Sequence, residues 1–421
     1  MRNKTKKIIN KLWIAAVVVG YLSCANLSFA DFVQESDRPD RSWLAQFRDA
    51  QRIKVTGSLQ DAINQCPGNQ SCELLIDQLE LESTVFLNRS KTRITGTSNN
   101  RIRWQPTANT SGFYIQIESN VSNIIIDNLN IDGDAIMRKP DVFGIGAYGE
   151  SIRNVLISNN RISNLSGEKN AHGIAIYGTG RTEQEAIRHI IIEKNTLSAL
   201  KTGSSEAIAI NGNVRNWEIS KNKIADVTNI AIDAIGGEGT SPTTMGSNNR
   251  VLPGSLDAAR LGFIEHNRIS YVSTKDNPAY NNTETWAAAI YIDGGRSILI
   301  RNNQLSQAPW GIEVGAENCV GTAYIQVIDN NSSQMVYGDL LLGGYAKKDY
   351  RTHDDINCDP KRSVDAEEGH GYVSRVVTAN NNLDSKPVLN DRQESQFIAN
   401  TVLQHRVEKS TITSPFIQLA H

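Results

Sequence analysis

Apolar and polar residues alternate along most of this chain in a short phrase that recurs many times. The phrase is an apolar residue, any residue, an apolar residue, two polar residues, Asn, any residue and an apolar residue. Alternation with a period of two is typical of a β-strand with one buried face. Repeats of this kind, carrying only short strands, predict a solenoid. Clear copies lie at 154–162, 189–197, 216–224, 262–269 and 297–305, and weaker ones at 123–131, 376–383 and 397–402.

A second strand phrase, built around Gly-Ile-x-Ile-x-Gly, falls between the copies of the first. The two phrases alternate one for one from Asn160 to Asn331, so each coil is expected to contain one copy of each phrase. No spacer with a period of 3.6 residues separates them, which leaves no room for a helix between strands. The sequence therefore predicts parallel strands that stack directly, coil upon coil, at 144–149, 173–178, 207–212, 229–234, 289–294, 311–316 and 339–344.

The Asn of the first phrase is expected to have a structural role at a turn between strands. Asn tolerates the left-handed backbone region, and its amide can bond both the backbone of a buried bend and the Asn of the next coil. Burial of such a turn requires partners for its polar groups. The sequence therefore predicts a structural ladder of Asn160, Asn195, Asn222, Asn267, Asn303, Asn331, Asn381 and Asn400.

The first thirty residues have the pattern of a secretory leader. Basic residues between Arg2 and Lys11 precede an apolar stretch at 12–22, and Ser28-Phe29-Ala30 suits cleavage after Ala30. Cys24 leaves open a lipid-anchored start. Because no later apolar run is long enough to cross a bilayer, we expect an exported protein, periplasmic or secreted.

Four cysteines follow the predicted leader, an even number that suits an oxidising compartment. Cys66 and Cys72 flank the turn-like segment PGNQS, which favours a local bridge between them. By elimination, Cys319 and Cys358 would form the second bridge.

A solenoid exposes apolar ends and needs caps. Ser58 and Asp61 have the spacing of a helix start, and Leu59, Ala62 and Ile63 share one face, which predicts a short amphipathic helix at the amino end. The repeat fades after Val402. We therefore expect a leader at 1–30, an extension at 31–54, the solenoid at 55–402 and a tail or cap at 403–421.

Together, these features resemble the right-handed parallel β-helix proteins of the pectate-lyase-like superfamily, over about residues 55–402. The resemblance implies an all-β, right-handed, single-stranded parallel β-helix. Polysaccharide lyases, glycoside hydrolases, uronate epimerases, phage depolymerases and adhesins are similar in shape, so the fold does not choose among them. The Arg-x-Pro-x-x-Arg motif of pectate lyases and the Asn-Thr-Asp motif of polygalacturonases are absent. Gly369-His370-Gly371 matches a tripeptide of polygalacturonases but stands in a charged loop.

The outward positions of the second phrase are expected to form columns on the solenoid wall, since its Ile and Val residues point inward. The first column is expected to read Gly146, Ala175, Ala209, Ala231, Tyr291, Glu313 and Leu341. The second is expected to read Tyr148, Tyr177, Asn211, Asp233, Asp293, Gly315 and Gly343.

Asp233 and Asp293 are the leading catalytic candidates. In the expected second column they occupy consecutive coils, which places their backbones about 4.8 Å apart. Two carboxyls so close cannot both ionise easily, so one keeps its proton and the other stays charged. A glycosidase requires such an acid and base. Glu313, one coil later in the neighbouring column, is the third candidate.

Long insertions at 236–260 and 271–286 fall between the strands that carry these carboxyls, and loops at one point of a regular scaffold usually build a site. Aromatic rings stack on sugars, while amides and charged groups bind hydroxyl or anionic groups. The expected substrate-binding residues are Tyr148, Tyr177, Asn211, Tyr291, Arg296, Glu317 and Tyr345.

The leading hypothesis is an exported, monomeric enzyme that cleaves glycosidic bonds of a polysaccharide without a cofactor. A lyase acting on a uronate polymer is the first alternative, with calcium held by Asp233, Asp293 and Glu313. The second is a non-catalytic glycan-binding or structural β-helix. His172 and His266 lack metal-ligand spacing. A net charge of −2 without a basic run argues against a nucleic-acid partner.

Overall fold

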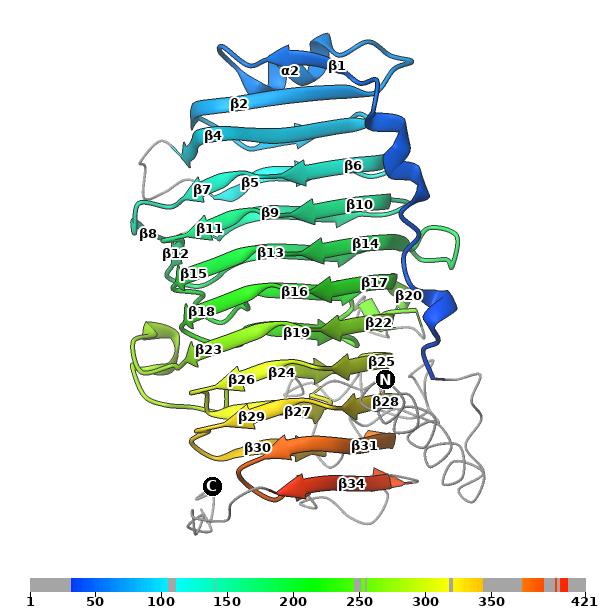
Figure 1. The fold of residues 1–421 in the computed structure, drawn as a ribbon, viewed down its shortest axis with the longest axis vertical. Coiled ribbons are helices and arrows are strands. Elements are labelled where there is room, and N and C mark those ends of the chain that lie inside the picture. Colours follow the sequence, from blue (N-terminus) through cyan, green and yellow to red (C-terminus); the bar gives the residue numbers. More distant parts are fainter. Residues whose placement is uncertain are drawn as a thin grey trace, which may run out of the picture.

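The structure, a computed structural model, is an elongated stack of parallel coils (Figure 1). It describes residues 32–104, 111–139, 141–245, 251–253, 256–317, 321–343, 373–389, 398–399 and 402–407. The predicted leader, the Cys319–Cys358 bridge, Tyr345, Gly369-His370-Gly371, Asn400 and the tail after 407 lie outside the described residues.

Three faces make up the coils, and every strand on them pairs in parallel with the strand one coil away. Face 1 consists of β1 (Gln51–Lys54), β2 (Cys72–Leu81), β4 (Thr92–Trp104), β6 (Ser122–Asp127), β10 (Arg153–Ser158), β14 (Ile187–Glu193), β17 (Val214–Ser220), β22 (Ala259–Glu265), β25 (Arg296–Arg301), β28 (Thr322–Ile328), β31 (Val373–Leu383) and β34 (Val402–Val407).

Face 2 is narrower and follows face 1 after a tight turn. Its strands are β7 (Asn130–Asp132), β11 (Arg161–Ser163), β15 (Thr196–Leu200), β18 (Lys223–Val227), β23 (Arg268–Val272), β26 (Gln304–Ser306) and β29 (Asn331–Ser333). The first sequence phrase therefore spans two strands, with its Asn at the bend between them.

Face 3 carries the second sequence phrase. It consists of β3 (Val85–Leu87), β5 (Gly112–Ile117), β9 (Val142–Gly149), β13 (Ala171–Gly178), β16 (Ile208–Gly212), β19 (Ile232–Ile235), β24 (Ala288–Asp293), β27 (Trp310–Gly315), β30 (Gly338–Leu342) and β32 (Val388–Leu389). The prediction of an all-β, right-handed parallel β-helix is confirmed.

Smaller elements decorate the coils: the strand pair β8 (Met137–Arg138) and β12 (Ser166–Gly167), the hairpin β20 (Pro242–Met245) and β21 (Val251–Pro253), the short helix η4 (Pro278–Tyr280), and β33 (Ile398–Ala399).

Stacked apolar side chains fill the interior. On face 3, Ile174, Ile208, Ile232, Ile290 and Ile312 occupy one register position on successive coils, and each is at most 1% exposed. Each coil thus buries its apolar residues against the next coil, which explains how a chain with many short strands forms one continuous core.

The Asn ladder is confirmed, with two corrections. Asn222 Nδ2 donates to Asn267 Oδ1 at 3.0 Å, and the same contact recurs from Asn160 to Asn381. The sixth member is Asn330, not Asn331, whose side chain is exposed. The left-handed residue is the one before the ladder Asn, such as Lys221 (φ 59°), because the ladder Asn itself must turn its amide into the core.

The amino end closes as the sequence predicts. Helix α2 (Leu59–Gln65) starts at Ser58, whose Oγ accepts a hydrogen bond from the Asp61 backbone N–H at 3.2 Å. Its apolar residues are buried in the core. Cys66 and Cys72 form the predicted disulfide.

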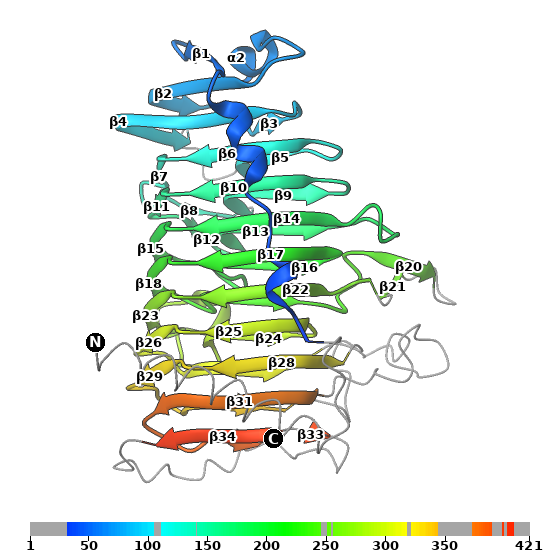
Figure 2. The same cartoon turned by 45° about the vertical axis from the view of Figure 1, so that its right-hand side comes forward.

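A strap, residues 32–50, runs along face 1 across successive coils (Figure 1 and Figure 2). It contains the short helices η2 (Glu35–Asp37) and η3 (Ser42–Phe47). Both its ends are held by apolar contacts, Phe47 with Ile125, Leu156 and Ile191, and Val33 with Phe263 and Leu299. Within the described residues, no helix has the length and hydropathy to cross a bilayer.

Candidate functional site

The register of face 3 differs from the predicted one at Asp233. Asp233 pairs with Ala209 on one side and with Tyr291 on the other, so Asp293 is not its direct neighbour. The segment NIAIDAI (229–235) fits the alternation equally well with Ile230 and Ile232 pointing inward or with Ile232 and Ala234 pointing inward. The fold uses Ile232 and Ala234 as the inward pair, and a pattern with period two cannot reveal a shift of two.

The observed outward columns follow from this register. Column 1 reads Gly146, Ala175, Ala209, Asp233, Tyr291, Glu313 and Leu341. Asp233 therefore replaces the predicted Ala231. Column 2 contains Tyr148, Tyr177, Asn211, Ile235, Asp293 and Gly315, with Ile235 where Asp233 was expected.

Asp233 and Asp293 are nevertheless neighbours, along a diagonal of the sheet. Adjacent strands lie about 4.8 Å apart and two residues span about 6.6 Å, so their backbones are separated by about 8 Å. The interaction persists at that distance, because the charge of Asp293 contributes to a raised pKa at Asp233. The structure thus brings the two predicted carboxyls together, although in a different geometry.

Both carboxyls are buried, which contradicts the expectation of an open outer wall. Asp233 is 3% exposed and Asp293 5% exposed. An inserted loop docks beside this face: Asn277 Nδ2 donates to the carbonyl oxygens of Gly203 and Thr228 at 2.7 and 2.6 Å. The carboxyls therefore form the floor of the candidate site.

Glu313 joins the floor from column 1. It is 1% exposed, and burial, together with the charges of Glu317 and Asp293, raises its pKa well above the usual range. One carboxyl oxygen of Glu313, Oε2, and one of Asp233, Oδ1, are buried without a hydrogen-bond partner within the described structure. Such atoms carry a desolvation cost that a bound donor would remove.

Glu206, which sequence reasoning missed, is the fourth buried carboxyl. Burial and the charge of Glu238 raise its pKa to about 8, and the charge of Glu206 in turn raises the pKa of Asp233. Its position directly before the strand phrase at 207–212 gave no signal, because the outward columns were read only from within the phrases.

His172 is a buried polar residue, as expected from the sequence. Its Nδ1 bonds the carbonyl oxygen of Glu206 at 2.9 Å, and its Nε2 bonds the hydroxyl of Tyr177 at 3.1 Å. Burial lowers the pKa of His172 to about 4, so its ring is neutral at physiological pH. The predicted binding residue Tyr177 thus borders the floor.

The side chains of Glu238 and Glu317 are exposed, and each contacts a residue of the outward columns. Asn211 Nδ2 donates to Glu238 Oε2 at 2.5 Å, and the hydroxyl of Tyr291 donates to Glu317 Oε1 at 3.2 Å. The backbone N–H of Glu317 donates to Asp293 Oδ1 at 2.5 Å. Three predicted binding residues, Asn211, Tyr291 and Glu317, therefore lie at this site.

Aromatic side chains flank the carboxyls along the solenoid axis. Trp286, Trp310 and Tyr337 form an aromatic platform, with ring centroids 5.7 to 6.4 Å apart, in an apolar cluster that includes Tyr291. Sequence reasoning missed this platform because its members lie at the edges of the strand phrases. On the other side, the rings of Tyr148 and Tyr177 are 6.1 Å apart.

Arg296 follows Asp293 by three residues and lies on face 1. It pairs in register with Arg260 on face 1, at the first residue of β25, and its charge lowers the pKa of Arg260. Among the described residues, no group of three or more His, Cys, Asp or Glu side chains is arranged to hold a metal ion.

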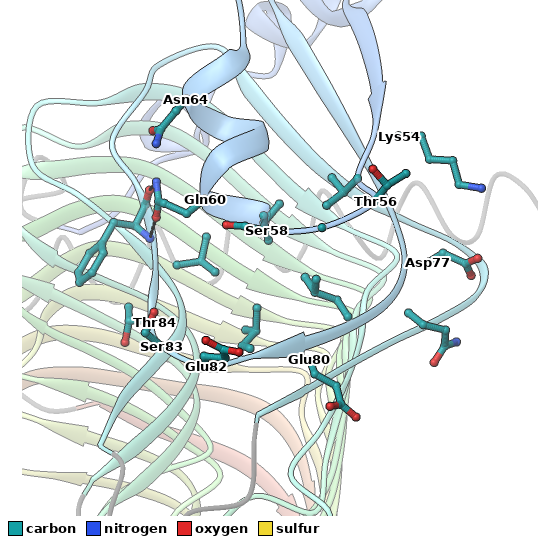
Figure 3. A pocket seen from close by; sticks show the side chains of 18 of the residues that line it. Lys54, Thr56, Ser58, Gln60, Asn64, Asp77, Glu80, Glu82, Ser83 and Thr84 are labelled. Carbon is teal, nitrogen blue, oxygen red and sulfur yellow. Dashed lines mark hydrogen bonds between the residues drawn. The ribbon is translucent and has the colours of Figure 1, made fainter.

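A separate cleft of about 1190 Å³ lies at the amino end, between α2 and β2 (Figure 3). Its labelled carboxylates, Asp77, Glu80 and Glu82, come from the turn between β2 and β3 and from β2 itself. None of its lining side chains carries a buried polar atom without a partner. The cleft lies beside β2 and β3, whereas Asp233 and Asp293 lie on β19 and β24, several coils away (Figure 1).

The comparisons with known proteins concern the fold. No protein family model matches the chain. The uncharacterized protein YwoF of Bacillus subtilis is 32% identical over 287 residues, which is 66% of this chain, and the chain spans 56% of the length of that relative.

Similar solved structures include an exopolygalacturonase from Thermotoga maritima (11% identity, TM-score 0.48, 83% of this chain and 82% of that one). Others are the A-module of mannuronan C-5 epimerase AlgE4 from Azotobacter vinelandii (10%, 0.46, 83% and 90%) and an endo-xylogalacturonan hydrolase from Aspergillus tubingensis (11%, 0.45, 85% and 91%). Sequence identities of 10 to 11% with TM-scores of 0.45 to 0.48 do not indicate a shared activity. The strand pairing of the chain itself establishes that it has the right-handed parallel β-helix fold of the pectate-lyase-like proteins.

Proposed function

We propose that this protein is a carbohydrate-active enzyme that cleaves glycosidic bonds of a polysaccharide by carboxyl acid/base chemistry on face 3. The observation that carries the proposal is the pair Asp233 and Asp293, two buried carboxyls on one face, one of which has a strongly raised pKa. Groups perturbed in this way by burial and by like charges are concentrated at functional sites.

Asp233 is the proposed general acid. Burial and the negative charges of Glu206 and Asp293 raise its pKa well above the usual range, so it holds its proton to a higher pH than an ordinary Asp. It would donate that proton to the glycosidic oxygen as the bond to the anomeric carbon breaks. Acid catalysis of this kind contributes about 10²- to 10⁴-fold to the rate.

Asp293 is the proposed general base. It would take a proton from a water molecule whose oxygen bonds to the anomeric carbon, while the leaving sugar keeps the proton from Asp233. The backbones of the two residues are about 8 Å apart. We propose that their carboxyl groups lie in the range of about 6.5 to 9.5 Å that accommodates that water and gives inversion at the anomeric carbon. Glu313 is proposed as a third carboxyl that supports the pair.

A polysaccharide panel tests the proposal. We expect new reducing ends without an ultraviolet-absorbing unsaturated product, and an initial product of inverted anomeric configuration by NMR. Asp233→Asn and Asp293→Asn should each abolish the signal, whereas Asp226→Asn, at an exposed position on β18, should not. An unsaturated product would identify a lyase instead. Full activity in both site variants would refute the assignment.

We further propose export of the mature chain, through the leader predicted at 1–30. The Cys66–Cys72 disulfide supports this, because such bridges persist in oxidising compartments. N-terminal sequencing of protein recovered outside the cytoplasm tests it: a chain that begins at Asp31 is expected, and a retained Met1 would contradict it.

A further inference from the structure

We propose that the site on face 3 selects glycans that carry no carboxylate, so that neutral polysaccharides are its ligands and uronate polymers are excluded. This inference rests on the proposed function, because it concerns the substrate of the same site. It contradicts the uronate-polymer alternative that the sequence left open.

The first argument is the sign of the charge at the site. Among the described residues, the charged groups that act most strongly on Asp233, Glu206 and Glu313 are all carboxylates, and the imidazole of His172 is neutral. Described residues thus bring together Glu206, Asp233, Glu238, Asp293, Glu313 and Glu317. The ionised members of this group, such as the proposed base Asp293, would repel a uronate, because burial has already weakened the screening by water.

The second argument is the hydrogen-bonding capacity of the floor. Asp233 Oδ1, Glu313 Oε2 and Asn211 Oδ1 are buried and have no partner within the described structure. Asn211 is independent of the carboxyl charges: its Nδ2 is already engaged with Glu238, so its free atom can only accept. Sugar hydroxyls can donate to Asn211 Oδ1 and can both donate to and accept from the carboxyls of Asp233 and Glu313, whereas an ionised carboxylate only accepts and leaves Asn211 Oδ1 without a partner.

The third argument is the aromatic platform of Trp286, Trp310 and Tyr337. Trp310 begins β27, the strand that also carries Glu313, so the platform adjoins the carboxyl floor on the same coils. Aromatic faces pack against the apolar faces of sugar rings irrespective of the charge on the ring substituents. Trp310 is 5% exposed, whereas Trp286 and Tyr337 are half-buried. The partly open rings of Trp286 and Tyr337 would therefore provide general sugar affinity, and the carboxyls the discrimination.

Matched polymer pairs test this directly. Highly methyl-esterified pectin is compared with polygalacturonate, and hydroxyethyl cellulose with carboxymethyl cellulose, beside neutral mannan, xylan and mixed-linkage glucan. Binding is measured by affinity electrophoresis and cleavage by reducing ends. We expect at least one neutral polymer to bind, and no carboxylated member of a pair to bind within tenfold of its neutral counterpart.

Variants locate the discrimination. Glu238→Gln combined with Glu317→Gln should raise the affinity for carboxylated polymers at least threefold, whereas Glu82→Gln, in the amino-terminal cleft, should not change it. Trp286→Ala should weaken binding of the neutral ligand about tenfold or more. Tyr271→Ala, at a 60% exposed aromatic residue on face 2, is the control that should leave binding unchanged. Trp310→Phe should retain most of the binding.

The outcomes separate the two proposals. Cleavage of a uronate polymer to reducing ends would overturn the selectivity and leave the proposed hydrolysis intact. Binding of a neutral polymer that is lost in Trp286→Ala, without cleavage of any polymer, would support the selectivity and overturn the hydrolysis. If no neutral polymer binds, the proposed selectivity is wrong.

Discussion

Two faces of this solenoid bury carboxyl groups on successive coils, but with neighbours of opposite charge: arginines on face 1 and other carboxyls on face 3. On face 1, under the strap, Glu193, Glu218 and Glu265 meet arginines: Arg41 lies 2.9 Å from Glu193 and 3.1 Å from Glu218, and Arg38 lies 3.0 Å from Glu265. Although burial opposes it, the hydrogen bond from Ser220 and the charges of Arg41 and Arg38 lower the pKa of Glu218.

On face 3, the carboxyls have comparable burial but carboxylate neighbours. Asp233 and Glu313 are 3% and 1% exposed, close to the 5% of Glu218, yet their pKa values are raised. Burial alone therefore does not distinguish a structural carboxyl from a functional one. The two kinds of carboxyl differ in their neighbours. The glutamates of face 1 form ion pairs with strap arginines, whereas Asp233 and Glu313 each have one carboxyl oxygen without a hydrogen-bond partner in the described structure, which a ligand donor would satisfy.

The largest expected effect is on catalysis. Asp233→Asn removes the proposed acid and should lower kcat by about 10³-fold. Glu218→Gln, an equally buried carboxyl on face 1, should change kcat less than about twofold. Initial rates on the best polymer of the panel, measured below the melting temperature of either variant, decide this. Equal losses in the two variants would erase the functional contrast between the faces.

The next effect is on stability at the strap. Glu218→Gln leaves Arg38 and Arg41 with fewer partners and should lower the free energy of unfolding by about 2 kcal/mol, discounted for the partial exposure of both arginines. Urea unfolding followed by circular dichroism measures it. Glu82→Gln, exposed at the amino end, is the matched control. A neutral result at Glu218 would mean that the ion pairs do not hold the strap.

Much of the scaffold behind this contrast could be predicted from the sequence. Alternation and recurrence gave the parallel coils, and the Asn positions gave the ladder, with an error of one residue where Asn330 and Asn331 are adjacent. The frame at Asp233 could not be predicted, since Ile230 and Ile232 fit the period as well as Ile232 and Ala234. The strap was missed because residues 32–50 contain no repeat, and its contacts join residues far apart in the sequence.

The two faces should also respond oppositely to pH. Glu206 has a pKa raised from 4.5 to about 8, so the folded state keeps a proton that the unfolded state loses, and stability falls as pH rises from about 4.5 to 8. Glu218 has a lowered pKa, so its contribution is present above pH 4.5 and is lost as pH falls below that value.

Melting temperatures of Glu206→Gln and wild type between pH 5 and 9 check the first sign. The wild type should lose stability relative to Glu206→Gln as pH rises. A constant difference across this range would contradict a raised pKa at Glu206.

Salt should give the smallest effect. At 1 M sodium chloride the Debye length is about 3 Å, which weakens partly exposed ion pairs. The difference in melting temperature between wild type and Arg41→Met should therefore shrink by about 1 to 2 °C relative to low salt. Arg161→Met, exposed on face 2, should show no salt-dependent difference. An unchanged Arg41→Met difference would indicate that the contribution of Arg41 is packing instead of charge.

The most direct test compares the stability of two variants at pH 7 by calorimetry. Asp233→Asn removes a group whose ionised form is disfavoured by burial and by like charges, and Glu218→Gln removes one that is paired. We expect the melting temperature to rise in Asp233→Asn by about 1 to 3 °C and to fall in Glu218→Gln. A fall in both variants would contradict the claim that the carboxyls of face 3 are held at a cost to stability for the sake of function.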